Sequence, residues 1–197
     1  MKVMRTGWAV ALGLVLAGCA QVPSADVDAA KHALDEARQA QAAEYAPQSW
    51  TAAEDAQAKL GSELDAQGQR WSALRSYTVA SQLAASAKTA AEQSRDEAMA
   101  GKEKAKTEAS TMMAQARDEA AHAQAAVTTA PHGKGTEADL ASLKSDATSI
   151  DATLQEMQQT FDAGGYIGAK TKAQAAMDAA KRIDDEIAQA KAGRRAA

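Results

Sequence analysis

The sequence predicts an all-α fold of antiparallel helical hairpins, arranged as an elongated alanine-rich bundle with a long central helix. Alanine makes up roughly a quarter of the chain, far above ordinary usage, whereas aromatic residues are 4% and the 197 residues include only 12 Gly and 3 Pro. Small apolar residues recur at steps of three and four, the spacing of one helix face, and none alternate at the step of two that marks a strand. Because alanine side chains bury little area, the expected core is thin, which weighs against a deep catalytic pocket.

The charge of the chain argues against a nucleic-acid partner. The formal net charge is −4 at pH 7, and binding to nucleic acid depends on clustered Lys and Arg. Arg194 and Arg195 form a small basic pair near the end of the chain, which we interpret as part of a solvated tail. The sequence therefore predicts no nucleic-acid partner.

The first 18 residues have the composition of a bacterial signal peptide. Lys2 and Arg5 form a short positive region, and an apolar run of about ten residues follows at 7–16. This run is too short to span a bilayer, which takes about 20 residues. It is followed closely by Cys19, the only cysteine of the chain.

The residues at this point, Leu16, Ala17, Gly18 and Cys19, resemble the lipobox of bacterial lipoproteins, Leu-[Ala/Ser]-[Gly/Ala]-Cys. The resemblance implies cleavage between Gly18 and Cys19 and attachment of a lipid with acyl chains such as palmitate to the Cys19 thiol. The first predicted partner is therefore a membrane, since two or three acyl chains hold a protein firmly on a bilayer. The alternative is a free or buried cysteine after an ordinary secretory signal.

Ala20 bears on which membrane this is. In enteric-type bacteria an Asp after the lipidated cysteine resembles a signal for retention in the inner membrane, and this chain has Ala20 there. For a Gram-negative host, the resemblance predicts the outer membrane, with the protein facing the periplasm.

Composition divides the chain into six segments. They are a signal peptide (1–18), a tether (19–25), an N-terminal helical region (26–127), a linker (128–136), a C-terminal helical hairpin (137–192) and a tail (193–197).

The N-terminal region is predicted to begin with two helices. The first covers about 26–44 and is ended by Pro47, because proline cannot continue a helix interior. The second starts either with Pro47 as its first residue or at a capping box of Thr51 with Glu54, and it ends at Gly68.

A third helix is predicted to open at Trp71, with Leu74 on its apolar side, and to continue for about 55 residues, or roughly 85 Å. Only Gly101 is a possible break in this stretch. The later apolar positions approach an eleven-residue repeat, which favours a straight or slightly right-handed helix pairing. They are Ala105, Ala109, Met112, Ala116, Ala120, Ala123 and Val127.

The C-terminal segment is predicted to be an antiparallel hairpin that turns at Gly164-Gly165 and packs like a coiled coil. Thr136 with Asp139 is expected to cap its first helix. The turn and the aromatic Tyr166 after it resemble Gly68 and Trp71, which indicates a duplicated hairpin. The expected apolar positions are Leu140, Leu143, Ala147, Ile150, Leu154, Met157 and Phe161, then Tyr166, Ala169, Ala173, Ala176, Ala180, Ile183, Ile187 and Ala190.

Residues 25–100 also resemble a helical bacterial lipoprotein domain of unknown function, the one numbered 4398. The resemblance is carried by Tyr45-Ala46-Pro47, by Trp50, and by Tyr77 with the spaced small residues that follow it. It implies a helical domain associated with the cell envelope, without an established activity.

No catalytic residue, cofactor or metal site is predicted. His32, His122 and His132 lie on separate segments and lack partners at the spacing of metal ligands. No serine stands in a Gly-x-Ser-x-Gly elbow. Four aromatic residues near helix starts are expected to staple the bundle, with binding of a partner as the alternative. They are Trp50, Trp71, Tyr77 and Tyr166.

The leading hypothesis is a non-enzymatic, lipid-anchored scaffold, spacer or adaptor that binds a protein partner or a second copy through coiled-coil-like helix faces. Noncovalent association with peptidoglycan remains open. Lipoproteins of the Braun type end in a lysine that is joined to peptidoglycan, whereas this chain ends in 194–197 (RRAA), so no covalent link is expected. The alternative is a binding protein for a small or lipidic ligand, or an enzyme, with a cleft between hairpins lined by Trp71, Tyr77 and Phe161.

Overall fold

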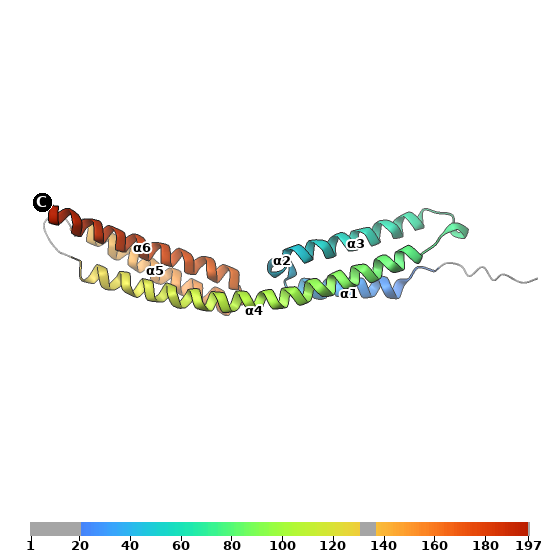
Figure 1. Ribbon diagram of the computed structural model, residues 1–197, viewed down its shortest axis with the longest axis horizontal. Coiled ribbons are helices and arrows are strands. Elements are labelled where there is room, and N and C mark those ends of the chain that lie inside the picture. Colours follow the sequence, from blue (N-terminus) through green and yellow to red (C-terminus); the bar gives the residue numbers. More distant parts are fainter. Residues whose placement is uncertain (1–20, 131–136, 197) are drawn as a thin grey trace, which may run out of the picture.

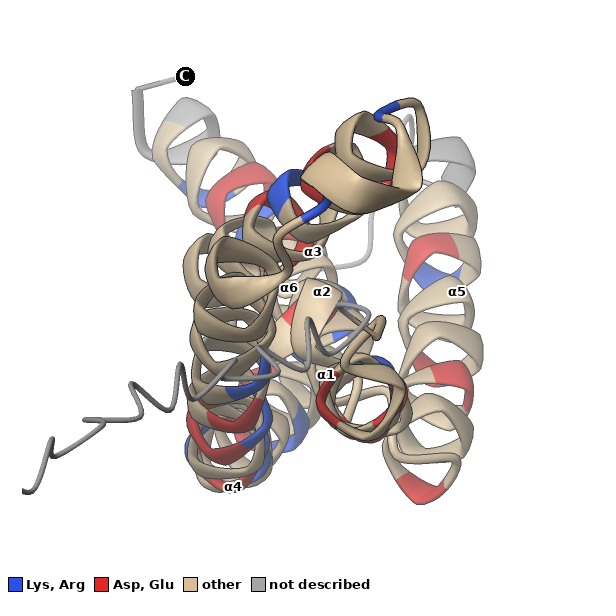
Figure 2. Ribbon diagram, turned by 90° about the vertical axis from the view of Figure 1, so that its right-hand side faces the viewer, with Lys and Arg blue, Asp and Glu red and all other residues tan. Residues whose placement is uncertain are grey.

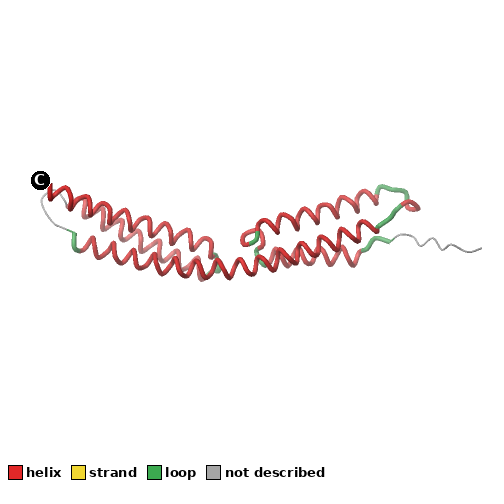
Figure 3. Tube along the Cα trace, in the orientation of Figure 1, coloured by secondary structure: helices red, strands yellow, loops and turns green. Residues whose placement is uncertain are grey.

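A computed structural model describes residues 21–130 and 137–196, and within these ranges the chain is helical with short loops and no strand (Figure 3). The predicted all-α fold with a long central helix is confirmed. The elements are α1 (Ser24–Gln39), α2 (Ala42–Tyr45), α3 (Pro47–Gly68), the short 3-10 helix η1 (Ser72–Leu74), α4 (Thr78–Thr128), α5 (Glu137–Asp162) and α6 (Tyr166–Ala196).

The helices form two three-helix bundles that lie end to end and share α4 (Figure 1). The proximal bundle contains α1, α3 and the first half of α4, and the distal bundle contains the second half of α4 with α5 and α6. In each bundle the first and third helices run in the same direction and the second runs back. The helix α4 is therefore the third helix of one bundle and the first helix of the next.

A single row of buried small residues, which we call the α4 row, connects the two bundles. Its steps are three or four residues, apart from one of seven between Ala98 and Ala105 that passes Gly101. Per turn they average about 3.6 residues, the period of an undistorted α-helix, so the row stays on one side of the helix. Met113 belongs to the row, whereas the predicted Met112 is partly buried against the same core beside it. The row consists of Ala80, Ala84, Ala87, Ala91, Ser94, Ala98, Ala105, Ala109, Met113, Ala116, Ala120, Ala123 and Val127.

The first reversal of the chain comes earlier than the sequence predicted. α1 ends at Gln39 instead of extending to residue 44, and Gln41 adopts a left-handed backbone with φ of 61°. This conformation costs roughly 1 kcal/mol or more for a residue with a side chain. The turn buries Ala42 fully and places Gln41 Oε1 where Lys102 Nζ donates to it at 2.5 Å. The prediction failed because neither glycine nor proline marks this turn.

The boundaries of α3 agree with those predicted from the sequence, whereas the start of α4 differs from the predicted one. α3 begins with Pro47 as its first residue and ends at Gly68, as predicted. The next helix opens at Thr78 and not at Trp71, and Leu74 is exposed instead of lying on an apolar face. Trp71, Leu74 and Tyr77 share a helical spacing, and that spacing concealed the loop.

The bundles meet at a waist formed by α2, by the middle of α4 and by the turn between α5 and α6. Gly101 lets α2 approach so closely that a Cβ atom at this position would lie 2.4 Å from the carbonyl oxygen of Tyr45. The Tyr45 hydroxyl donates to the carbonyl oxygen of Gly164 at 3.2 Å. α4 continues through Gly101, so the possible break there was wrong, and the glycine serves close packing.

The distal hairpin has the predicted turn and the predicted division of large and small residues. Gly164 has a φ of 84°, and Gly165 N–H donates to the carbonyl oxygen of Thr160 at 2.9 Å. Leu143, Ile150 and Met157 of α5 are buried, and α6 offers mostly alanines. Of the positions predicted on α6, Ala190 is exposed. The predicted cap at Thr136 lies outside the described residues.

Polar side chains border the alanine seams and join neighbouring helices. Arg95 of α4 donates to Glu36 of α1 at 2.8 Å, and Lys172 of α6 donates to Glu156 of α5 at 2.6 Å. Lys170 of α6 donates to Glu108 of α4. These lysine hydrogen bonds, with the charge they bring, lower the pKa of Glu156 and of Glu108.

Two glycine substitutions should have opposite effects on stability. Gly61 lies in the interior of α3 with open space around its missing side chain. Gly61→Ala should raise the free energy of unfolding by about 0.5–1 kcal/mol, the helix-propensity difference. Gly101→Ala should lower it by about 1–3 kcal/mol, because the new methyl group meets a backbone carbonyl and overpacks the waist. Urea unfolding followed by circular dichroism checks both. Stabilisation by Gly101→Ala would contradict the close approach at the waist.

The pair of Glu108 and Lys170 should couple α4 to α6 in a pH-dependent way. Because the folded pKa of Glu108 lies below its ordinary value of 4.5, the charged carboxylate favours the fold. Its contribution is complete above about pH 4.5 and is lost as the pH falls through the folded pKa. A double-mutant cycle of Glu108→Gln and Lys170→Met should show a favourable coupling free energy at pH 7 that weakens progressively as the pH is lowered below 4.5. A coupling independent of pH would contradict this interpretation.

Candidate interaction surfaces

The N-terminal end of the rod carries the residues next to the predicted lipid site. Leu16, Ala17, Gly18 and Cys19 lie outside the described residues, so the lipobox remains a prediction from the sequence. The described chain starts at Gln21, and α1 begins at Ser24 at the outer end of the proximal bundle (Figure 1). None of the described helices combines the length and the apolar character that crossing a bilayer requires.

The loop between α3 and α4 lies at the same end of the rod. This tip loop comprises residues 69–76 and includes η1 (Figure 1). Trp71 is 74% exposed and Leu74 is 68% exposed. Large apolar side chains with this exposure carry a hydration cost, which contact with an apolar partner would remove. Of the four aromatic residues considered for binding a partner, Trp71 is thus the one whose side chain is exposed for such a contact.

Hydrogen bonds hold the tip loop in a defined shape. The Arg75 guanidinium donates to the carbonyl oxygens of Arg70 and Gly68, each at 2.9 Å. The side chain of Gln67, only 4% exposed, accepts a bond from Ser76 N–H at 3.0 Å. These bonds satisfy backbone groups that a loop of this length would otherwise leave to solvent. Trp71 and Leu74 therefore project from a loop whose backbone is held by hydrogen bonds.

The other three predicted aromatics are used within the fold. Tyr77 is buried in the proximal bundle, so its ring is not on a free surface. Trp50 is half-buried beneath Arg38, whose Cζ atom lies 5.7 Å from the ring centroid. Tyr166 packs edge-on against Phe161 at a centroid distance of 5.1 Å. These contacts fit the expected role of stapling the bundle.

The cleft considered for a ligand is not formed by its expected residues. Trp71 lies at the tip, Tyr77 lies in the core of the proximal bundle, and Phe161 lies at the waist. The junction between the bundles is occupied by Tyr45 and by the turn at Gly164. The three aromatics therefore line no common space.

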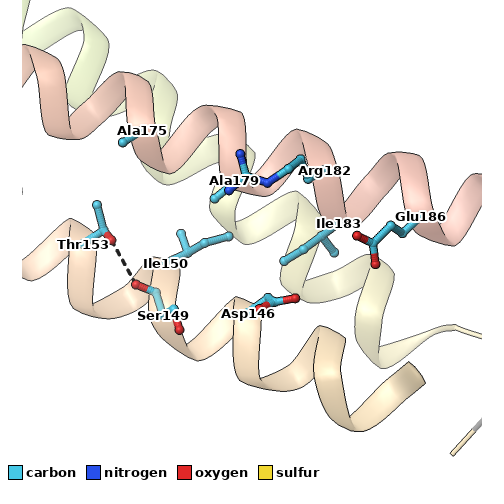
Figure 4. A pocket seen from close by; sticks show the side chains of 9 residues that line it. All are labelled: Asp146, Ser149, Ile150, Thr153, Ala175, Ala179, Arg182, Ile183 and Glu186. Carbon is cyan, nitrogen blue, oxygen red and sulfur yellow. Dashed lines mark hydrogen bonds between the residues drawn. The ribbon is translucent and has the colours of Figure 1, made fainter. Parts of the chain in front are cut away.

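A shallow groove of about 340 Å³ follows the seam between α5 and α6 (Figure 4). Ile150 and Ile183 lie between the two helices, and exposed charged side chains surround them. Two hydroxyls of the groove already donate to carbonyl oxygens of their own helix, Ser149 to Ser145 and Thr153 to Ser149, each at 3.0 Å. The groove has no polar group held in a buried position, which an active site would need for orienting a substrate.

The described histidines take part in pairs between or within helices. His122 Nδ1 of α4 lies 2.9 Å from Asp184 Oδ2 of α6, and His32 Nδ1 lies 3.4 Å from Glu36 Oε1 in α1. His132 lies outside the described residues. Within the ranges that the structure covers, no three His, Cys, Asp or Glu side chains gather closely enough to hold a metal ion.

The apolar faces predicted to bind a partner helix are used inside the chain. The heptad positions of α5 and α6 pack on the distal half of the α4 row, and α1 and α3 pack on its proximal half. The outward faces of these helices are mainly polar, as the pattern of exposed residues shows. A partner of the rod would therefore meet polar faces or the tip loop.

The sequence pattern indicates Trp71 as a candidate but not its position in a loop between two helices. One signal in the sequence marks the tip: residues 66–91 contain no Asp or Glu, although the whole chain has 26 acidic residues. The stretch includes Arg70, Arg75 and Lys88. Figure 2 looks onto this end of the rod and shows Lys and Arg positions in the tip.

Comparisons of the chain with protein-family models, with curated proteins and with solved structures find no match. The resemblances to the lipobox and to the lipoprotein domain therefore stay predictions from the sequence.

Proposed function

We propose that the protein is a lipid-anchored, non-enzymatic spacer or scaffold of the cell envelope. The observation that carries the proposal is the position of the start of α1 on the rod. α1 begins at Ser24, at the outer end of the proximal bundle, only five positions after the lipobox cysteine, Cys19. A lipid on Cys19 would hold that end of the rod at the membrane.

Chain geometry supports the role of a spacer. Five residues span at most about 18 Å when fully extended, so the proximal bundle must stay close to the lipid. α4 has 51 residues, which correspond to about 75 Å at 1.5 Å per residue. A rod anchored at one end and standing on the bilayer would hold the far end of the distal bundle roughly that far from the lipid surface.

The surface chemistry supports a scaffold more than an enzyme or a ligand-binding protein. In the described chain the candidate aromatics are dispersed, and the groove between α5 and α6 is shallow with two of its hydroxyls bonded to backbone. Helix faces that could pair with a partner helix pack on α4 instead. We infer that partners, including a second copy or noncovalently bound peptidoglycan, would meet the polar outer faces. The outer membrane facing the periplasm is the proposed location.

The anchor is tested by labelling cells with radioactive palmitate. The parent chain should take up label and fractionate with membranes. Cys19→Ala should take up none, because the chain has a single cysteine and loses the only thiol that can accept the lipid. A variant labelled like the parent would contradict the anchor, and a Gly61→Ala variant controls for substitution in a helical segment.

The spacer is tested by measuring the height of two positions above the membrane. Single cysteines replace Gln82, exposed near the start of α4, and Thr128, exposed at its end. Each is labelled with a fluorophore in the acylated protein, and vesicles carrying a quenching lipid dye are added. The label at position 82 should be strongly quenched and the label at 128 only weakly, because energy transfer falls steeply over a helix of about 75 Å. Equal quenching at both positions would mean that the rod lies flat.

A further inference from the structure

Exposed apolar side chains are concentrated at one end of the rod. Six large apolar residues are exposed in the described chain, and four of them are near the N-terminal end. Val22 precedes α1, Trp71 and Leu74 lie in the tip loop, and Val79 is in the first turn of α4. The other two, Met99 and Ile167, lie near the waist. Exposed apolar surface is costly in water at any position on the rod, so contact with solvent does not explain why these side chains gather at one end.

The positive charge of the tip loop favours contact with an anionic surface. Arg70 and Arg75 flank Trp71 and Leu74, and no acidic residue occurs from 66 to 91. The closest acid along α3 is Asp65, in the last turn of the helix at the base of the loop. Basic residues near a bilayer are attracted by anionic headgroups. Trp side chains favour the level of the headgroups, where the ring is partly apolar and its N–H meets water.

The two bundles have the same arrangement of helices, so the tip loop can be compared with the equivalent turn of the distal bundle. Both the tip loop and the turn at Gly164 connect the second and third helices of a bundle, and both point toward the N-terminal end (Figure 1). The turn at Gly164 is covered, because it contacts Tyr45 of the preceding bundle. The tip loop occupies the same place in the proximal bundle, and no bundle precedes it in the described chain.

The length of the tether decides between a membrane and another bundle as the occupant. From Cys19 to Ser24 the chain reaches at most about 18 Å. α1 alone, with 16 residues, is about 24 Å long. A further bundle, from this chain or a second copy, would not fit between a lipid on Cys19 and the tip.

We propose that the tip loop inserts Trp71 and Leu74 into the headgroup region of the anionic bilayer that carries the Cys19 lipid. The inference rests on the proposed lipid anchor. With the lipid as one point of attachment and the loop as a second, the rod would stand on its end instead of swinging about a single point. The waist and the distal bundle take no part in this contact.

Tryptophan fluorescence tests the insertion, because Trp71 is its own probe. Trp50→Phe removes the other tryptophan beyond the signal peptide, and the double variant Trp50→Phe/Trp71→Phe is the blank. The processed protein is purified, its mass gives its acylation state, and it is mixed with vesicles of phosphatidylethanolamine and phosphatidylglycerol. Emission from Trp71 should shift to shorter wavelength and be quenched by brominated acyl chains.

Matched substitutions show whether the loop itself makes the contact. Leu74→Ser should reduce the quenching of Trp71, because it removes an inserted neighbour. Met99→Ser replaces a similarly exposed residue, 59% accessible, near the waist and should leave quenching unchanged. Equal loss in both variants would overturn the proposal, since a specific tip contact would not respond to the waist.

The mass measurement separates failure of the tip from failure of the anchor. An acylated protein that floats with vesicles while Trp71 emission stays unchanged would overturn the insertion and leave the anchor intact. An unacylated protein would contradict the proposed function. The same emission measurement then decides the inference on the unacylated chain, after the spectrum of Trp50→Phe/Trp71→Phe is subtracted to remove any emission of Trp8. A shift in the remaining Trp71 emission on adding vesicles supports insertion, and an unchanged spectrum overturns it.

Discussion

The close approach of helices along the α4 row is the constraint on which the rest of the structure depends. Each buried alanine contributes only about one methyl group of apolar burial, roughly 0.8 kcal/mol. The row gains stability through its length, since it continues through both bundles. Alanine also sets the distance between helix axes, and at Gly101 even a methyl group is too large. Bulk is supplied from the facing helices, mainly by Leu60 of α3 and by Ile150 and Met157 of α5.

Those parts of the fold that depend on local chemistry could be predicted from the sequence. Pro47 and Gly68 delimit α3, and the glycines at 164 and 165 make the distal turn, because backbone freedom or its loss acts at the residue itself. Gln41 could not be found in this way, because its left-handed backbone is stabilised by Lys102, 61 positions later. The tip loop was hidden for another reason: residues exposed for contact outside the chain can have the same spacing as residues buried within it.

Exposed apolar and basic side chains are distributed unevenly along the rod. One end gathers exposed apolar side chains, arginines and the residues adjoining the predicted lipid site. The distal bundle has an apolar core with charged pairs along its edges, such as Glu108 with Lys170. The candidate surface at the tip was predictable only in part: Trp71 was identified from its type, and its exposure followed from the loop that holds it. That α1 begins at the same end of the rod as the tip loop became visible only in three dimensions.

The shared helix also restricts how such a rod can change in length. One residue added to the middle of α4 would rotate the distal bundle by about 100° relative to the proximal one, at 3.6 residues per turn. The distal half of the α4 row would still face α5 and α6, but the turn at Gly164 would no longer lie beside Tyr45 at the waist. Insertions of about seven or eleven residues, close to two or three whole turns, come near to restoring the alignment. A spacer of this design can be lengthened only in steps of roughly 10 Å or more, because each added segment must contain close to a whole number of helical turns.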